Sequence, residues 1–274
     1  MTVCDWAYDH DVACHMDREV NVTRALALQF TPGTSLGHLE SYLTGSGIAC
    51  HAVLMSEPHA PVVLDDYDML IALGGAYDPN ESDRYPFLAE ARQIIRQAVE
   101  RDVPFLGICL GGQLLAHGLG AAVTRMPEPE IGLVEITVAS SHRDDPLLRS
   151  LGPHLKVVEF HHDTFVVPQS GALLASSSLC PTQIVRCASR AYALQFHPEV
   201  SSEGFARSVE RSYANYVAPE KAPNGPAIAR EVENNYAAIR AHGDALFANF
   251  VRLALPRTPW SQDVPVPIHE RTIV

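Results

Sequence analysis

The sequence predicts an α/β fold in which a mostly parallel central sheet is flanked by helices, with extra antiparallel strands in the second half. In the first half, short apolar runs alternate with segments of helical periodicity. That rhythm is typical of a parallel sheet covered on both faces. In the second half, apolar runs follow one another without helices between them, which favours antiparallel strands there.

The elements of the first half are bounded by glycine and proline, the residues that most often end strands and helices. We expect strands at 24–30, 49–55, 69–73 and 104–108. We expect helices at 36–43, 86–100 and 113–118, of which 86–100 has the clearest apolar stripe.

The second half is predicted to hold five strands and one long amphipathic helix. The strands are expected at 132–139, 156–160, 172–176, 183–187 and 191–196. The helix is expected at 227–253, with a possible break at Gly243. The chain therefore divides into a polar extension (1–22), one domain that includes this helix (23–255) and an irregular, proline-rich tail (256–274).

Composition excludes several classes of partner. The chain has 274 residues, 47% of them hydrophobic, and a formal net charge of −12 without any lysine or arginine run. An acidic surface repels phosphate, so we expect neither nucleic-acid nor membrane-surface binding. There is no apolar run of membrane-spanning length, and the acidic first residues do not resemble a secretory signal, so we expect a cytoplasmic protein.

Six cysteines are present without any C-x-x-C pair, and we expect them to be thiols. Cys180 and Cys187 are interpreted as packing residues. The extension also holds side chains that are possible zinc ligands, but their spacing matches no zinc motif and we predict no metal site there. These are Cys4, His10, Cys14 and His15.

The segment GICLGGQ, centred on Cys109, lies between an expected strand and an expected helix. This is the context of a nucleophile at the apex of a tight turn, with cysteine in the place of serine. Gly107 and Gly111 supply the small residues that such a turn needs on either side of the apex. The following helix points its N-terminus at Cys109, which favours the thiolate, and the N–H of Leu110 is available to an oxyanion. The alternative is an ordinary turn with a buried structural cysteine.

The segment LQFHPEV follows the last expected strand and offers a general base. Residues two apart in extended backbone face the same side, and the residue before proline is driven to be extended. His197 and Glu199 therefore lie on one side, where Glu199 can orient the imidazole that accepts the proton of Cys109. A solvated loop is the alternative for this segment taken by itself.

The segment LGGAYDP leaves the third expected strand. Its paired glycines let backbone N–H groups approach a ligand, so the N–H of Gly75 is a second candidate oxyanion donor. An ordinary glycine turn is the alternative. The dinucleotide fingerprint G-x-G-x-x-G is absent from this segment.

Together, and in this order, the three segments resemble the triad-type, or class I, glutamine amidotransferases. GICLGGQLLAHGLG resembles the nucleophile block, LQFHPEV the His-Pro-Glu block and LGGAYDP the oxyanion loop of that family. EIG at 130–132 and FHHDTF at 160–165 resemble further blocks, so the resemblance covers about residues 24–200.

The resemblance implies a flavodoxin-like core and hydrolysis of a γ-glutamyl amide through a thioester on Cys109, with no cofactor and no metal. It assigns the triad to Cys109, His197 and Glu199 and the oxyanion donors to Gly75 and Leu110. It also implies four residues that line the substrate pocket: Tyr77, Gln113, Phe160 and His162.

The leaving group is left open. The family often has proline at the position of Ala76 and commonly glycine at that of His162, whose side chain would narrow or reshape the pocket. Ammonia could pass to a separate synthase, because the residues after Glu199 leave no room for a second catalytic domain. A γ-glutamyl peptidase that releases an amine is the alternative, and a non-catalytic binding module is a third hypothesis.

Overall fold

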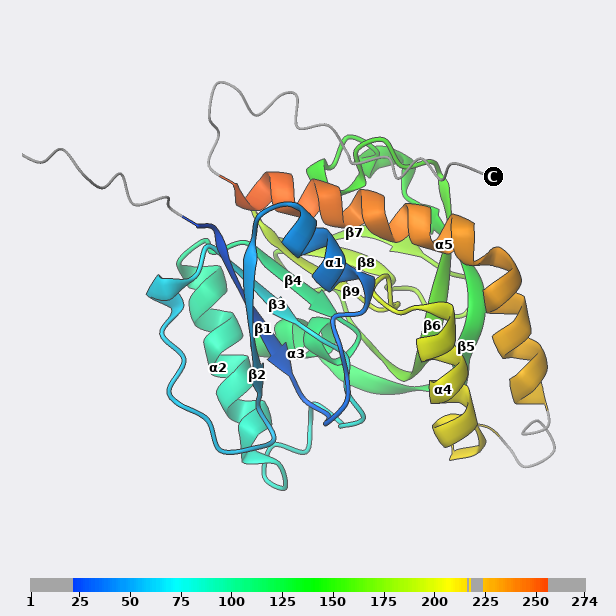
Figure 1. The fold of residues 1–274 in the computed structure, drawn as a ribbon, viewed down its shortest axis with the longest axis horizontal. Coiled ribbons are helices and arrows are strands. Elements are labelled where there is room, and N and C mark those ends of the chain that lie inside the picture. The colour runs from blue at the N-terminus through cyan, green and yellow to red at the C-terminus, as the bar shows by residue number, and fades with distance from the viewer. Residues whose placement is uncertain (1–21, 216, 218–223, 256–274) are drawn as a thin grey trace, which may run out of the picture.

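A computed structural model describes residues 22–215, 217 and 224–255 of the chain. A single nine-stranded sheet runs through it in the order β2-β1-β3-β4-β9-β8-β7-β5-β6 (Figure 1). Five neighbouring strands are parallel: β2 (Ala49–Leu54), β1 (Arg24–Gln29), β3 (Met69–Ala72), β4 (Phe105–Ile108) and β9 (Ala191–Leu194). The rest are antiparallel: β8 (Ile184–Ala188), β7 (Ala172–Ser176), β5 (Val123–Val138) and β6 (His154–Phe165).

Helices cover both faces of the parallel half, as predicted. The strand residues alternate between two apolar cores because successive side chains point to opposite faces. Leu26, Leu70 and Phe105 lie in the core beneath α2 (Pro86–Glu100) and α3 (Leu110–Gly118). Ala27 and Ile71 lie in the opposite core with α1 (His38–Gly45) and the C-terminal half of α5 (Gly225–Ala254). The predicted mostly parallel, flavodoxin-like sheet with antiparallel additions is confirmed.

Two parts of the second half differ from the sequence prediction. β5 and β6 are far longer than the expected 132–139 and 156–160 and form a twisted ribbon at one edge of the sheet. Pro127 and Pro129 break the alternation of β5, and the register with β6 shifts between Arg125 and Glu130 because proline lacks the N–H that a ladder needs.

A helix absent from the prediction, α4 (Ser202–Ser212), follows the His-Pro-Glu segment directly. The side chain of Ser201 caps its N-terminus by accepting from the N–H of Gly204. Only Phe205 and Val209 of α4 are buried, too narrow a stripe to stand out in the sequence.

Gly243, a possible break in the last helix, lies instead within the continuous helix α5. A Cβ on Gly243 would lie 2.6 Å from the backbone oxygen of Pro198 and 3.0 Å from Nε2 of His38. The glycine therefore lets α5 pack closely against the His-Pro-Glu segment and α1.

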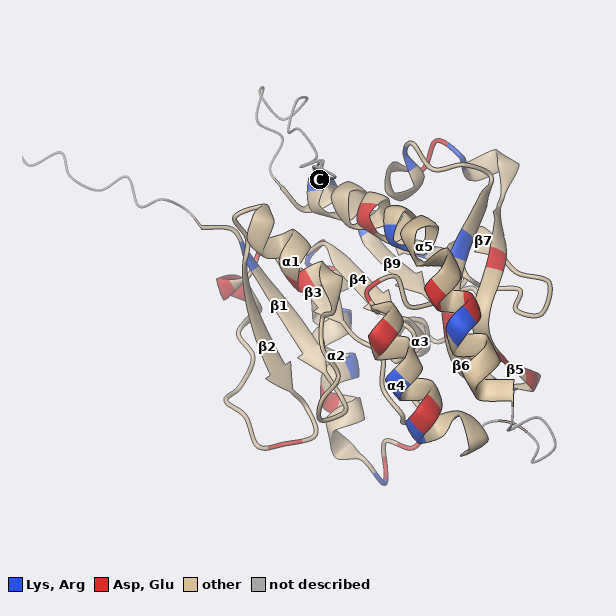
Figure 2. Cartoon of the chain, turned by 45° about the vertical axis from the view of Figure 1, so that its right-hand side comes forward, with Lys and Arg blue, Asp and Glu red and all other residues tan. Residues whose placement is uncertain are grey.

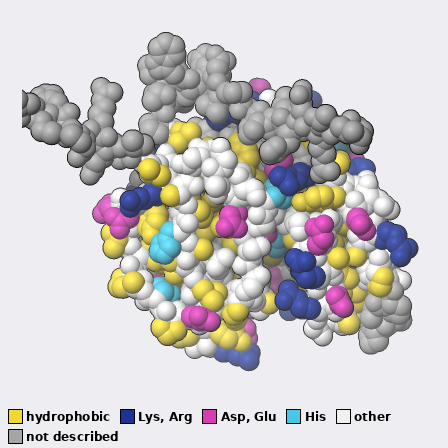
Figure 3. Space-filling view, in the orientation of Figure 1, with side chains coloured by type: hydrophobic (Ala, Val, Ile, Leu, Met, Phe, Trp, Pro, Cys, Tyr) yellow, Lys and Arg dark blue, Asp and Glu magenta, His cyan; other side chains and the backbone are white. Residues whose placement is uncertain are grey.

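The surface carries charges of both signs. Lys and Arg lie among Asp and Glu along α4 and α5 (Figure 2), and no large basic field appears on the face shown in Figure 3. No helix within the described residues is long and apolar enough to cross a membrane. The predicted extension (1–22) and tail (256–274) lie outside the described residues apart from Val22, and so do the candidate zinc ligands.

Candidate active site

The turn at Cys109 joins β4 to α3 at the carboxyl end of the parallel strands. Cys109 has φ 49° and ψ −110°, a conformation that L-residues rarely adopt and that marks strained, functional positions. The turn is compact because a Cβ on Gly107 would lie 2.6 Å from the backbone of Gly111. The thiol of Cys109 is 7% exposed and stands at the N-terminus of α3.

His197 and Glu199 come from the end of β9, the strand beside β4. Nδ1 of His197 lies 2.8 Å from Oε1 of Glu199, and the His197 side chain is close enough to Cys109 for the two to interact electrostatically. Burial acts to lower the pKa of His197, but the adjacent Glu199 carboxylate and Cys109 hold that pKa well above its ordinary value. The three residues predicted as a triad are therefore brought together in space.

The glycine loop after β3 lies against both parts of this arrangement. A Cβ on Gly74 would lie 2.7 Å from the His197 ring and 3.5 Å from Cβ of Cys109. A Cβ on Gly75 would lie 2.9 Å from Cδ2 of Leu110. The two residues predicted to supply oxyanion N–H groups are therefore neighbours beside the thiol.

A cavity of about 210 Å³ opens over Cys109. All four predicted pocket residues line it, and so does Gly75. These are Tyr77, Gln113, Phe160 and His162. Its size suits a group as small as one amino acid, below the range of about 300–1,000 Å³ that larger ligands occupy.

Charged residues that the sequence patterns did not single out also line this cavity: Asp78, Glu81, Arg125, His161 and Asp163. Nε of Arg125 lies 3.0 Å from one carboxylate oxygen of Asp163, and Nδ1 of His162 lies 2.7 Å from the other. These partners lower the pKa of Asp163 although its burial acts to raise it. Strand alternation along 159–163 is the sequence signal that could have placed His161 and Asp163 on one face.

Beside the cavity, β5 and β6 hold a buried cluster of ionisable groups around His161. Nε2 of His161 lies 3.2 Å from a carboxylate oxygen of Glu130 and 3.2 Å from one of Glu159. Burial acts to lower the pKa of His161, but these two partners hold it well above its ordinary value. Burial raises the pKa of the Glu159 carboxyl.

Ligand atoms of Glu130, His161 and Cys180 lie within 4.8 Å of one another, so these residues have the composition of a metal site. Glu130 already accepts hydrogen bonds from Oγ of Ser177 and Nε2 of Gln183. Sγ of Cys180 is hydrogen bonded to Thr164. A metal ion held by these three residues would displace these hydrogen bonds.

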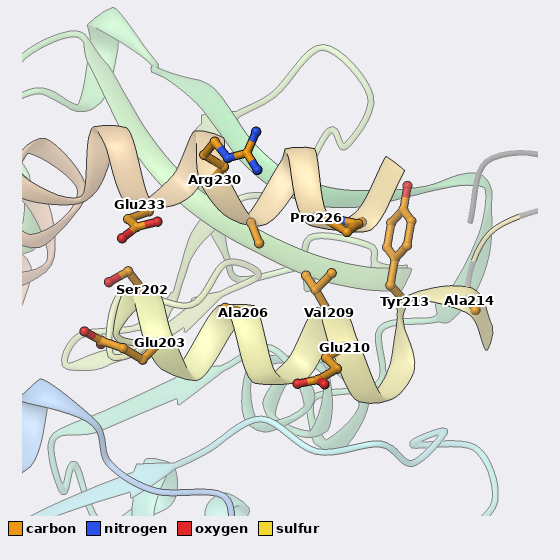
Figure 4. Close-up of a pocket in the computed structure, with 12 residues that line it drawn as sticks. Ser202, Glu203, Ala206, Val209, Glu210, Tyr213, Ala214, Pro226, Arg230 and Glu233 are labelled. Atoms are coloured by element: carbon orange, nitrogen blue, oxygen red, sulfur yellow. The ribbon is translucent and has the colours of Figure 1, made fainter. Parts of the chain in front are cut away.

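A larger cavity, of about 650 Å³, lies between α4 and the first turns of α5 (Figure 4). It is lined by Val209 of α4, by Tyr213 just after that helix, and by Arg230 and Glu233 of α5. None of the predicted site residues lines it. The candidate chemistry therefore belongs to the smaller cavity.

A cysteine on a tight strand-to-helix turn, with a His–Glu pair just after the neighbouring parallel strand, is an arrangement found in α/β enzymes that form thioesters on cysteine. Within that class, the family model for class I glutamine amidotransferases matches residues 36–214. The chain belongs to this family.

Curated relatives agree with this assignment. A putative glutamine amidotransferase-like protein of Salmonella typhimurium, YfeJ, is 36% identical over 155 residues, which cover 56% of this chain and 65% of that protein. The chain thus matches just under two thirds of that relative's length. One component of a glutamine-hydrolysing GMP synthase from Sulfurisphaera tokodaii is 36% identical over 156 residues, covering 56% of this chain and 78% of that component.

Solved structures show the same fold. A glutamine amidotransferase from Thermotoga maritima superposes with a TM-score of 0.74 at 26% identity, covering 84% of this chain and 98% of that one. One from Methylobacillus flagellatus has a TM-score of 0.72 at 26% identity, covering 86% and 97%.

Proposed function

We propose that this chain hydrolyses the side-chain amide of glutamine through a γ-glutamyl thioester on Cys109. The observation that carries the proposal is the contact of Cys109 with a histidine whose other ring nitrogen lies 2.8 Å from a buried carboxylate. The raised pKa of His197 suits a ring that takes the proton of Cys109, and Glu199 fixes the ring orientation. The relatives' descriptions as glutamine amidotransferases support the same chemistry.

The reaction has two halves. The thiolate of Cys109 attacks the amide carbon, and the N–H groups of Gly75 and Leu110 stabilise the oxyanion. The C–N bond then breaks as His197 gives its proton to the leaving nitrogen, which departs as ammonia. His197 next takes a proton from water, which attacks the thioester and releases glutamate with the thiolate restored.

We infer further that the ammonia is used by a separate synthase. The GMP synthase relatives are each named as one component of a glutamine-hydrolysing synthase. For the acceptor enzyme we name only its class, an ammonia-dependent synthase. We expect the reaction to take place in the cytoplasm.

A γ-glutamyl peptidase is the second candidate. The observation that favours it is the polar wall of the cavity, where Arg125 and His162 both contact Asp163. Such a wall offers hydrogen bonds to an amine larger than ammonia. The side chain of His162 occupies a position that is commonly glycine in proteins this sequence resembles.

The direct test is Cys109→Ala, with Cys50→Ala as the matched control because Cys50 is half-buried on the edge strand β2. Glutamate release from glutamine should vanish in the first variant and persist in the second. Turnover retained by Cys109→Ala would contradict the assignment. Ammonia and amine release from glutamine and a panel of γ-glutamyl peptides, measured side by side, separates the two candidate functions.

A further inference from the structure

Gln195 is a buried polar residue beside the candidate nucleophile. It follows β9 directly, is 0% exposed, and sits between apolar Leu194 and Phe196. Its backbone N–H donates to the carbonyl of Gln183, 3.0 Å away, which fixes its main chain. Its side-chain Nε2 lies 3.7 Å from Sγ of Cys109, within hydrogen-bond range for sulfur. A buried amide needs partners, and here one partner is the reacting atom.

The orientation of the Gln195 side-chain amide is fixed by its contact with Gln113. Nε2 of Gln113 lies 3.1 Å from the backbone oxygen of Asp163 and 3.3 Å from Oε1 of Gln195. The backbone oxygen of Asp163 can only accept, so the Gln113 atom that faces it is the nitrogen, and the Gln195 atom that this nitrogen also faces must be an acceptor. Oε1 of Gln195 therefore faces Gln113, and the NH₂ group of Gln195 faces the thiol.

The far end of this chain of hydrogen bonds is anchored as well. The backbone oxygen of Asp163 also lies 2.9 Å from Nδ1 of His161. An atom facing a carbonyl oxygen must donate, so Nδ1 of His161 carries a hydrogen. Gln113 and Gln195 thus form a chain of hydrogen bonds with defined donors and acceptors, which runs from β6 to the turn at Cys109.

We propose that Gln195 is a catalytic residue whose amide N–H donates to Sγ of Cys109 and stabilises the thiolate. The proposal rests on the proposed function only for its purpose, since the contact itself involves no substrate. Hydrogen bonds to charged acceptors are roughly twice as strong as neutral ones. A donor that is already aimed at sulfur stabilises the thiolate more than the thiol. His197 stabilises the same atom by its charge, and Gln195 adds a donor from the floor of the site.

Other ionisable groups surround this contact and set its background. His197 and Glu199 face the thiol from the end of β9. His161 interacts with Cys109 from β6, and Glu159 interacts with His197 from the same strand. Glu130 reaches the group from β5 through its contact with His161. None of these side chains is altered by a substitution at Gln195, so the effect of the amide can be isolated.

The test measures the thiol without turnover. Alkylation of Cys109 by iodoacetamide is followed from about pH 5 to pH 9.5, a range that spans ordinary and lowered thiol pKa values, by mass spectrometry of its peptide, in the wild-type chain and in Gln195→Met. Methionine keeps a similar length but cannot donate. The midpoint of the alkylation profile should move upward by about one pH unit, because the thiolate loses a hydrogen bond that the neutral thiol accepts only weakly. At pH values well below the wild-type midpoint the rate should fall about tenfold, and the plateau at high pH should be unchanged.

Gln183→Met is the matched control. Gln183 is also 0% exposed, and its side chain donates to Glu130 rather than to Cys109. It should lose comparable stability in urea unfolding, while its alkylation midpoint moves far less than that of Gln195→Met, because Gln183 reaches Cys109 only through Glu130 and His161. If Gln195→Met does not fold, Gln195→Leu also removes the donor without adding a charge and should also move the midpoint upward.

A wild-type midpoint in either folded Gln195 variant overturns the proposal, and so does an equal shift in Gln183→Met. A chain that alkylates as expected but turns over no γ-glutamyl substrate would contradict the proposed function alone.

Discussion

Gly243→Ala tests whether α5 holds the catalytic loop in place. The new Cβ would lie 2.6 Å from the backbone oxygen of Pro198, the residue between the candidate base and its carboxylate. Ordinary contact begins at 3.4 Å, so helix or loop must move by about 0.8 Å to restore it. His38, whose Nε2 would be 3.0 Å away, blocks the other direction, and its backbone N–H is bonded to the carbonyl of Glu199.

The effect on stability should be small because two terms oppose each other. Overpacking costs about 1–3 kcal/mol, whereas alanine favours a helix interior over glycine by about 1 kcal/mol. The effect on activity should be larger, because a displacement near 1 Å at a catalytic group can lower the rate about a hundredfold. We therefore expect kcat to fall tenfold or more with little change in the free energy of unfolding.

Glutamate release and urea unfolding are the two assays. Gly45→Ala is the matched control: Gly45 is also in a helix, the last residue of α1, and a Cβ there would meet nothing within 4 Å. It should leave kcat unchanged. A folded Gly243→Ala enzyme with the wild-type kcat would refute the reasoning, because the close approach of α5 would then have no influence on the loop.

Three further predictions concern the cavity and the buried cluster. The pKa of His161 is higher in the folded state than in the unfolded chain, where it is about 6.5. The charged His161 therefore stabilises the fold fully below about pH 6.5, and this contribution declines as the pH rises towards the raised pKa. His161→Gln should therefore flatten the fall of unfolding free energy with pH, by up to about 1.4 kcal/mol per pH unit in urea titrations; an unchanged slope would contradict the charged assignment. His162→Gly should enlarge the cavity and raise kcat/KM for bulky γ-glutamyl amines relative to kcat/KM for glutamine. If the ratio of these two values is unchanged, His162 does not determine substrate specificity. The Cβ of Gly75→Ala would crowd Leu110 at 2.9 Å, so this variant should lower kcat at least tenfold by displacing the candidate oxyanion donor, with little change in KM. A raised KM with the wild-type kcat would instead indicate a loss of substrate binding.

Most of the parallel half of the fold could be predicted from the sequence. The helix predicted at 86–100 is α2 with the same limits, and the strands from β1 to β4 begin or end within two residues of their expected positions. Local signals suffice there, because the strands β1, β3 and β4 are apolar runs buried in the interior and glycine or proline lies within a few residues of each strand end. The prolines at 127 and 129 hid the first half of β5, since proline ordinarily excludes a strand.

The site residues that lie in short sequence motifs could be predicted, whereas contacts between residues far apart in the sequence could not. Cys109, His197 and Glu199 each lie in a short motif beside a strand end, and the structure brings them together. Gln195 lies within one of those motifs, yet its partner Gln113 is 82 residues away. A glutamine inside an apolar strand end indicates a buried polar contact, but only the fold reveals which atom it meets.

The position of α5 also has a consequence for the order of events during synthesis. Leu246, Phe247 and Phe250 complete the apolar core over β1 and β3, and Gly243 abuts the loop that carries the base. Chains emerge from the ribosome N-terminus first, and domains fold as units. A nascent chain in which Cys109, His197 and Glu199 have already left the ribosome still lacks the helix that packs against the loop of His197 and Glu199. Competence for the proposed reaction should therefore appear only when α5 has left the exit tunnel.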